Sequence, residues 1–324
     1  LLTPLAVLSI YFHIQFDRSL KSSGNRHLVA LAESQRNTID LFLQERVVNI
    51  FGVFRSQGFS LTPTSDDMAG YLDDLRRASD AFIDVGFFGP DGVQSGYAGP
   101  YIHLRGKDYS GEQWFQVLMD QQRDYHISDV NLGFRNRPHF SIAVRQRFDG
   151  APVIVRATLD PAKFYDFLTT IHREKGVDSA LVNAKGAYQV VDPTHGKVLS
   201  VGDFMPAGDS DVGVEEFANG NGAVLVAYAR LRETPWILMV RQPLSVAYEQ
   251  MFRTRQIMIV VTLALTVVTV ASIWWGIDSF IRRGLAAAQA RQELRYQLLH
   301  ASKLASVGEL AAGVAHEINN PLAI

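Results

Sequence analysis

The stretch HFSIAVRQRFDGAPVIVRATLDP, residues 139–161, holds two strand-like runs, His139 to Phe148 and Pro152 to Leu159, and the second run is rich in β-branched residues. Asp149-Gly150 lies between them, and this dipeptide favours a tight turn between antiparallel strands. Asp160-Pro161 then opens a predicted helix through Ile171, with proline in the first turn, where its missing N–H costs nothing. The stretch therefore predicts a hairpin of two long strands followed by a helix.

A shorter hairpin precedes this stretch. The runs Ala81 to Phe88 and Val93 to Tyr97 are separated by the turn residues Gly89-Pro90-Asp91-Gly92. An amphipathic segment, Tyr109 to Gln122, lies between the two hairpins. The predicted order is a hairpin, a helix and two long antiparallel strands.

The same order recurs more faintly downstream. Its short hairpin is Ser179 to Asn183, the turn 184–186 and Ala187 to Val191, and its long strands are Ala223 to Arg230 and Trp236 to Arg241. We expect an α+β protein with two stacked modules of similar topology, the first at 61–172 and the second at 173–256. A single irregular α+β domain is the alternative interpretation.

A long amphipathic helix is predicted in front of both modules, at 17–60. Apolar residues recur there at helical spacing, with charges between them, and they include Leu28, Leu31, Ile39, Phe42, Leu43, Val47, Ile50 and Phe54. Residues 1–16 are almost wholly apolar but slightly short of a full membrane span. We expect them to be a truncated first transmembrane helix; a buried core helix and the core of a signal peptide are the alternatives.

Residues 257–277 contain no charged side chain and end near Trp274-Trp275, aromatic residues that favour the membrane interface. They are predicted to cross a membrane. The chain then stays polar, alanine-rich and helical through 278–302. This segment is too short to hold a two-helix signalling relay (HAMP-type). From 303 to 324 a further helix carries a 3-4 apolar seam of the kind that pairs helices in bundles: Leu304, Val307, Ala311, Val314 and Ile318.

Composition excludes several classes of function. With 31 basic and 33 acidic residues and a net charge of −2, the chain offers no electrostatic case for a nucleic-acid partner. It has no cysteine, so neither a disulfide framework nor a thiolate metal site is expected. We predict no metal site in this chain.

The string Val314-Ala315-His316-Glu317-Ile318-Asn319-Asn320-Pro321-Leu322 places a neutral nucleophile beside an acid/base group. By itself, a histidine next to a glutamate on a helix is usually a solvated face. The whole string, with Gly308-Glu309-Leu310-Ala311 before it, resembles the phosphoacceptor box of sensor histidine kinases of two-component systems.

The resemblance implies a role for each residue of the box. His316 falls on the phosphoacceptor, Glu317 on the acid/base residue, Asn320 on the position associated with phosphatase activity, and Pro321 on the proline that bends the helix. It also implies a homodimer and a response-regulator aspartate as acceptor. The chain stops at Ile324, just after the box, so ATP and Mg²⁺ are expected in a catalytic domain beyond it, and this chain is expected to be inactive alone.

Residues 17–256 resemble the double Cache sensor of bacterial receptors, a pair of PAS-like modules. The resemblance rests on Gly106-Lys107-Asp108-Tyr109-Ser110, Trp114-Phe115, Ile127-Ser128-Asp129-Val130 and the end of the strand at Arg156 to Asp160. It implies a small ligand in the membrane-distal module, the first one. If His316 reacts with ATP it faces the cytoplasm, which places the sensor in the periplasm and the chain in the bacterial inner membrane.

The ligand class stays open between an amine and a carboxylate. In amino-acid-binding members of the family, an arginine two residues before the tryptophan binds the carboxylate of the ligand. In this chain the tryptophan is Trp114, and Glu112 occupies the position of that arginine. Basic residues such as Arg105 and Lys107 are possible replacements, although each one is as readily a solvated loop charge. The predicted ligand-binding residues are Tyr101, Tyr109, Trp114, Phe115, Asp129, Arg135, Arg137, His139 and Asp160.

Two other classes of protein are alternatives to the receptor kinase. A non-enzymatic receptor with the same sensor, such as a chemotaxis transducer, is the alternative function. A periplasmic transport-binding protein is disfavoured by the apolar segment at 257–277.

Overall fold

The computed structural model describes residues 2–121, 123–171, 176–219 and 222–319. The chain divides into two compact units, 1–252 and 253–324. The first unit begins with one continuous helix, α1 (Leu2–Val53), followed by α2 (Ser65–Ala78). The predicted segments 1–16 and 17–60 therefore share a helix, which ends at Val53.

Helix α2 was not predicted, although the sequence carries a signal for it. Thr64 and Asp67 form a reciprocal capping box, in which each side chain accepts a hydrogen bond from the other residue's backbone N–H. The buried face of the helix consists of Met68, Tyr71, Leu72 and Leu75.

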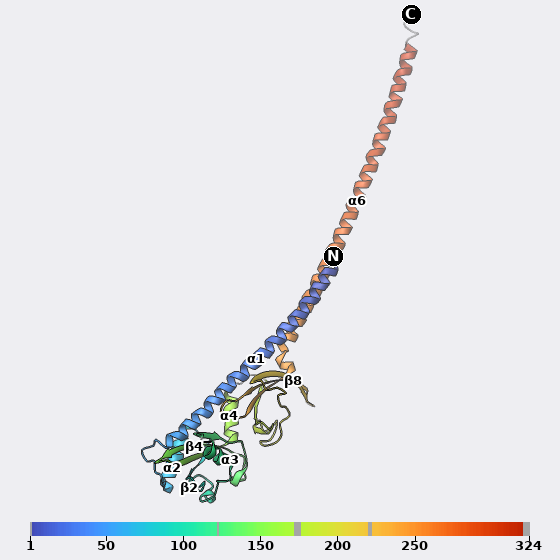
Figure 1. The fold of residues 1–324 in the computed structure, drawn as a ribbon. Coiled ribbons are helices and arrows are strands. Elements are labelled where there is room, and N and C mark those ends of the chain that lie inside the picture. The colour runs from blue at the N-terminus through green and yellow to red at the C-terminus, as the bar shows by residue number, and fades with distance from the viewer. Residues whose placement is uncertain (1, 122, 172–175, 220–221, 320–324) are drawn as a thin grey trace. The chain divides into compact units, whose positions relative to one another are not determined.

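The first module, in which Figure 1 labels β2 and β4, is a five-stranded antiparallel sheet in the order β2-β1-β5-β4-β3. Its strands are β1 (Phe82–Phe88), β2 (Gln94–Ala98), β3 (Tyr125–Ile127), β4 (Phe140–Phe148) and β5 (Ala151–Leu159). Three short helices lie in its connections: η1 (Ile102–Leu104), α3 (Gln113–Asp120) and η2 (Gly133–Arg135).

The turn between β4 and β5 confirms the hairpin that the sequence predicts. Asp149 and Gly150 have φ of 49° and 84°, as a tight turn matched to the twist of the strands requires. The two strands pair in full register, from Phe140 opposite Leu159 to Phe148 opposite Ala151.

The second module repeats this topology. After α4 (Pro161–Ile171), the strands β6 (Asp178–Val182), β7 (Tyr188–Val190), β8 (Val212–Asn219), β9 (Gly222–Arg230) and β10 (Ile237–Pro243) form a sheet in the order β7-β6-β10-β9-β8. The predicted pair of modules is confirmed. The edge strand β8 was missed because two adjacent glutamates, Glu215 and Glu216, weaken the strand pattern of its sequence.

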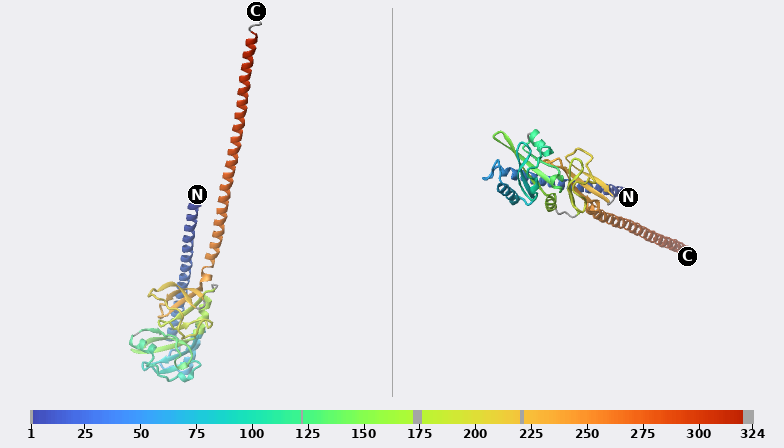
Figure 2. Two further views of the ribbon diagram at one scale, coloured as in Figure 1. Left: turned by 90° about the vertical axis from the view of Figure 1, so that its right-hand side faces the viewer. Right: turned by 90° about the horizontal axis from the view of Figure 1, so that it is seen from below.

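Helix α1 joins the two modules into one core, and the modules follow one another along it (Figure 2). Its side chains Leu28, Ile39, Leu43 and Ile50 are buried. A single hydrophobic cluster contains these residues together with side chains from both sheets, such as Phe140 and Leu238. The opposite faces of the two sheets carry their own, separate clusters.

After the short helix α5 (Leu244–Ala247), the chain enters α6 (Glu249–Asn319), which forms almost all of the second unit. In the described part of the chain, this is the one helix long and apolar enough to cross a membrane. The predicted span 257–277 lies within it. Leu304, Val307 and Val314 of the predicted seam are exposed on this single chain.

Candidate functional site

A buried ion pair lies on the face of the first sheet turned away from α1. Val85 and Phe87 of β1 pack into the cluster with α1, so Asp84 and Phe88 alternate onto the other face. There Arg135 holds Asp84 with two parallel hydrogen bonds, from Nε at 2.9 Å and from Nη2 at 2.7 Å. The two side chains are 4% and 1% exposed, and each oxygen of this carboxylate accepts a hydrogen bond from Arg135.

His139 extends this pair. Its Nε2 lies 3.0 Å from Nη1 of Arg135, and its Nδ1 lies 2.9 Å from the carbonyl oxygen of Arg137. Since a guanidinium only donates, Nε2 accepts and Nδ1 carries the proton. Burial, with Arg135 nearby, lowers the pKa of His139 to about 4, so the imidazole is neutral at physiological pH.

Arg156 of β5 is the second buried guanidinium of this face, 5% exposed. It lies over the rings of Tyr109 and Trp114, at 5.2 and 4.9 Å from their centroids, and its Nε has no hydrogen-bond partner. Burial lowers its pKa to about 10, which leaves it charged at neutral pH. Arg156 thus lacks the carboxylate partner that Arg135 has.

Aromatic side chains close the site. Phe88, Tyr109, Trp114 and Phe115 meet edge to face, and Phe134 of the 131–139 loop covers Tyr109. Three polar atoms in this wall are buried without a partner: the Tyr109 hydroxyl, the Trp114 Nε1 and the amide oxygen of Gln94. Each of these atoms can be satisfied by a ligand or by an ordered water molecule.

A glycine permits the close approach behind this cluster. Gly99 has φ of +150°, and a side chain there would collide with Asp84 and with the Tyr97 hydroxyl. The Tyr97 hydroxyl accepts a hydrogen bond from the N–H of Tyr101 at 2.9 Å, which places the half-buried Tyr101 beside the cluster.

The structure brings five of the nine predicted ligand-binding residues into this site: Tyr109, Trp114, Phe115, Arg135 and His139. Arg137 is exposed and contributes its carbonyl oxygen to His139. Asp160 accepts a hydrogen bond from Ala162 N at the start of α4, at 2.8 Å.

Asp129 lies elsewhere, at the contact between the two modules. Its carboxylate accepts hydrogen bonds from Nε1 of Trp236 at 2.7 Å and from Nδ2 of Asn183 at 2.9 Å, both in the second module. Next to it, the backbone N–H of Val130 donates to the side chain of Gln189 at 2.6 Å. Asp129 thus fixes one module to the other.

Sequence reasoning missed Asp84, Gln94, Arg156 and Thr158 as site residues. Thr158 accepts a hydrogen bond from Nη2 of Arg135 at 2.9 Å. The signal for two of them was available: Asp84 and Arg156 are charges within runs otherwise suited to buried strands. A charge in such a position needs a partner or a ligand.

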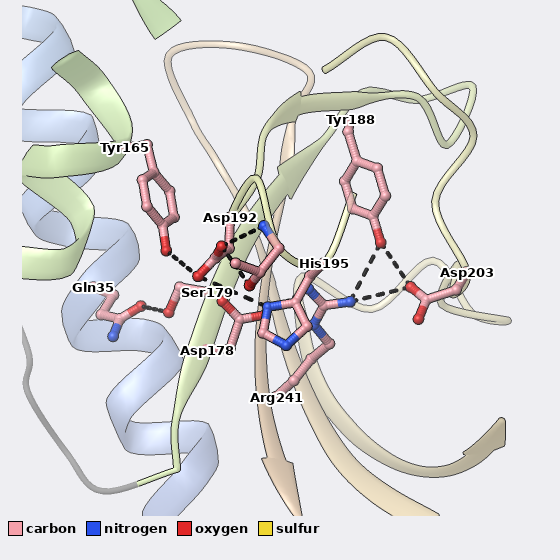
Figure 3. A network of polar contacts seen from close by, with 10 residues as sticks. Gln35, Tyr165, Asp178, Ser179, Tyr188, Asp192, His195, Asp203 and Arg241 are labelled. Atoms are coloured by element: carbon pink, nitrogen blue, oxygen red, sulfur yellow. Dashed lines mark hydrogen bonds and ion pairs between the residues drawn. The ribbon is translucent and has the colours of Figure 1, made fainter. Parts of the chain in front are cut away.

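The second module has an open cavity of about 830 Å³ between α4, the start of β6 and the end of β10. Arg241 lies there between Asp178 and Asp203, at 2.6 and 3.2 Å (Figure 3). Ser179 donates a hydrogen bond to Gln35 of α1 on the other side of the strand. The arginine of this module is therefore satisfied by its own carboxylates.

Asp192 and His195 complete the polar wall of this cavity. Hydrogen bonds from Thr194, with one from Tyr165, lower the pKa of Asp192 to about 2. One carboxylate oxygen each from Asp178 and Asp192, with Nδ1 of His195, lies within 4.8 Å of the others, a spacing that a metal ion would accept. Since the hydrogen bonds and ion pairs within the group already account for its carboxylates, we assign no ligand to it.

The string predicted to be a phosphoacceptor box begins at Val314, near the end of α6. His316 and Glu317 are helical, but the positions of their side chains are not described, and Asn320 lies outside the described residues. The predicted roles of all three therefore remain predictions.

No protein-family model matches the sequence, and no curated protein matches it either. Solved structures do match. The ligand-binding domain of the Pseudomonas fluorescens chemoreceptor CtaA, in complex with L-isoleucine, aligns with a TM-score of 0.56 at 16% identity, over 72% of this chain and 98% of that one. The ligand-binding domain of the Pseudomonas aeruginosa chemoreceptor PctB, in complex with L-Arg, gives 0.54 at 14%, over 72% and 92%.

An extracellular ligand-binding receptor from Desulfohalobium retbaense aligns with a TM-score of 0.52 at 12% identity. That alignment covers 66% of this chain and 39% of the receptor. At such identities the likeness shows the fold alone. The first unit has the α+β fold of Cache-like ligand-binding domains, with a long N-terminal helix and two antiparallel sheets.

Proposed function

We propose that this chain is the sensory and phosphoacceptor part of a membrane-bound histidine kinase. The observation that carries the proposal is the sequence string from His316 to Pro321, which begins within α6, the same helix that holds the apolar segment. In this proposal ATP with Mg²⁺ phosphorylates His316, and a response-regulator aspartate then takes the phosphoryl group. The sensor lies in the periplasm and the string in the cytoplasm.

Chemistry and helix pattern both support this role. A neutral imidazole is a nucleophile near pH 7, and Glu317 is close enough in sequence to accept or orient its proton. The apolar seam of Leu304, Val307 and Val314, exposed on a single chain, would be buried in a homodimer of helices. Without such a partner, these side chains would remain in water.

The sensor is proposed to bind a small polar organic molecule in its first module. Support comes from the buried polar cluster around Arg135 and Arg156, with its unpartnered atoms on Tyr109 and Trp114. CtaA and PctB, which share the fold, were solved with single amino acids bound. For ligand binding to control His316, the ligand must bind the two signalling states with different affinity.

The test is phosphorylation of the full-length protein in membranes, with γ-labelled ATP and Mg²⁺. We expect acid-labile, alkali-stable label on the wild type and at least a 100-fold loss in His316→Gln. His300→Gln, which changes an exposed histidine of the same helix, is the matched control and keeps its label. Undiminished label in His316→Gln would disprove the phosphoacceptor assignment.

A non-enzymatic receptor is the second candidate function, since both chemoreceptor domains compared above share the fold of this sensor. In that case, membranes containing the full-length protein would incorporate no phosphate on histidine. Attractant-dependent control of a separate kinase would be observed instead, and it would be insensitive to His316→Gln.

A further inference from the structure

The buried site of the first module carries one uncompensated positive charge. Two guanidinium groups, Arg135 and Arg156, face a single carboxylate, Asp84, and the neutral imidazole of His139. Both carboxylate oxygens of Asp84 accept hydrogen bonds from Arg135. The second positive charge, that of Arg156, therefore has no buried carboxylate as its partner. A buried charge without a counter-charge is strongly unfavourable, which makes Arg156 the group that an anion would satisfy.

The neighbours of Arg156 favour the same occupant. The Trp114 Nε1 and the Tyr109 hydroxyl, whose rings flank the guanidinium, are buried without partners and can both donate to an anion. The amide oxygen of Gln94 is also without a partner, but it is neutral and leaves the charge balance unchanged. The Nε of Arg156, Nε1 of Trp114 and hydroxyl of Tyr109 form a set of donors.

An ammonium group finds no free carboxylate among the buried groups, and the unpartnered acceptor that the site offers, the amide oxygen of Gln94, carries no charge. Both oxygens of Asp84 are taken by Arg135, and the Tyr97 hydroxyl is also within 3.5 Å of one of them. Glu112 is exposed, at the start of α3 rather than among the buried groups. A bound ammonium would therefore add a second uncompensated charge beside Arg156.

We propose that the first module recognises a small organic monocarboxylate that has no ammonium group. Its carboxylate binds Arg156 with help from Trp114 and Tyr109, and its apolar part lies against the rings of Phe88 and Trp114. The inference rests on the sensing role proposed above and names the ligand class for that site. It separates this sensor from CtaA and PctB, which were solved with amino acids.

The first experiment compares three probes built on the skeleton of L-valine: L-valine itself, isovalerate, which lacks its ammonium group, and isobutylamine, which lacks its carboxylate. Binding to the whole chain in lipid nanodiscs is measured by calorimetry, and thermal unfolding is followed by tryptophan fluorescence. Isovalerate is expected to bind at least 10-fold more tightly than L-valine, and isobutylamine is expected not to bind. Acetate, propionate and benzoate, tested in the same way, measure how large an apolar part the site accepts.

The second experiment does not depend on the choice of probe. Arg156→Met removes a buried, uncompensated charge, so the ligand-free variant should unfold about 2 °C higher than the wild type and lose at least 30-fold in carboxylate affinity. Trp114→Phe keeps a ring and removes one donor, which should weaken binding by several-fold. Arg55→Met, at an exposed arginine between α1 and α2, should change neither quantity.

Several results would overturn the inference. A lower unfolding temperature in Arg156→Met would show a purely structural arginine. Equal or tighter binding of L-valine would show an amino-acid site, and it would leave the proposed sensing role intact. A wild type that none of the carboxylates binds would also exclude the monocarboxylate class, whereas failure of the proposed kinase role appears only in the labelling of His316.

Discussion

The two sheets of the first unit share one topology and place an arginine and an aspartate on the same face, yet the arginine has different partners in each. In the second module Arg241 of β10 lies between two carboxylates beside an open cavity. In the first module Arg156 of β5 lies against two aromatic rings. The nearby Asp84 forms its ion pair with Arg135 of η2 instead. A duplicated fold therefore holds one arginine with carboxylate partners, Arg241, and one without, Arg156.

The largest expected effect comes from removing the carboxylate of the buried Asp84–Arg135 ion pair in the first module. Asp84→Ala would leave Arg135 buried beside Arg156 with no carboxylate, and we expect it to lower the free energy of unfolding by about 4 kcal/mol. Urea denaturation followed by tryptophan fluorescence measures this. Asp80→Ala removes the exposed ion pair with Lys163 and serves as the control, with no measurable loss. Equal losses in the two variants would contradict the assignment of Asp84 as a buried counter-charge.

A pH titration probes the same cluster with a smaller effect. His139 faces Arg135, Arg156 and Asp84, and its pKa falls from 6.5 to about 4 on folding, mainly through burial. Between these values the unfolded chain binds a proton that the folded chain does not. The free energy of unfolding should therefore decrease by up to about 3 kcal/mol as the pH falls from about 6.5 to about 4.

His139→Gln, which keeps a polar side chain, should flatten the stability profile across that pH window. The measurement is the urea midpoint at half-unit steps of pH. A variant whose profile still follows that of the wild type would assign the acid sensitivity to other groups.

The smallest expected effect lies in the second module. Arg241→Met leaves Asp178 and Asp203 facing each other, but both carboxylates are partly in water, so the loss should be about 1–2 kcal/mol. The sign sharpens the comparison, because Arg156→Met in the first module is expected to stabilise the chain. Thermal unfolding of both variants in parallel measures the two signs, and a shared sign would remove the proposed difference between the modules.

Local sequence signals predicted most of the fold. The long strands around Asp149-Gly150, the short hairpins and the internal repeat were all visible because turn residues separate strand-like runs. Helix α2 and strand β8 were missed. The main sequence signal for α2 is the capping box of Thr64 and Asp67, and β8 is an edge strand with polar residues. Motif and composition thus located the modules better than their edges.

The candidate site was harder to predict, because it is assembled from distant parts of the chain. Arg135 and His139 were recognised as loop charges near the aromatic residues, but their partner Asp84 lies 51 residues before Arg135. Asp129 was grouped with them, yet its carboxylate binds Trp236 of the other module. Which charges are paired is a property of sheet order and register, and the sequence alone does not determine it.

The single hydrophobic cluster along α1 makes one thermodynamic unit out of two modules. Phe140 of the first sheet and Leu238 of the second belong to the same packed core, with Ile39 and Leu43 of the helix among them. Since the loss of either sheet would expose side chains that the other also covers, the two modules and α1 should unfold in one cooperative transition. A molecule that binds only the first module would thereby stabilise the second, although it touches no residue there.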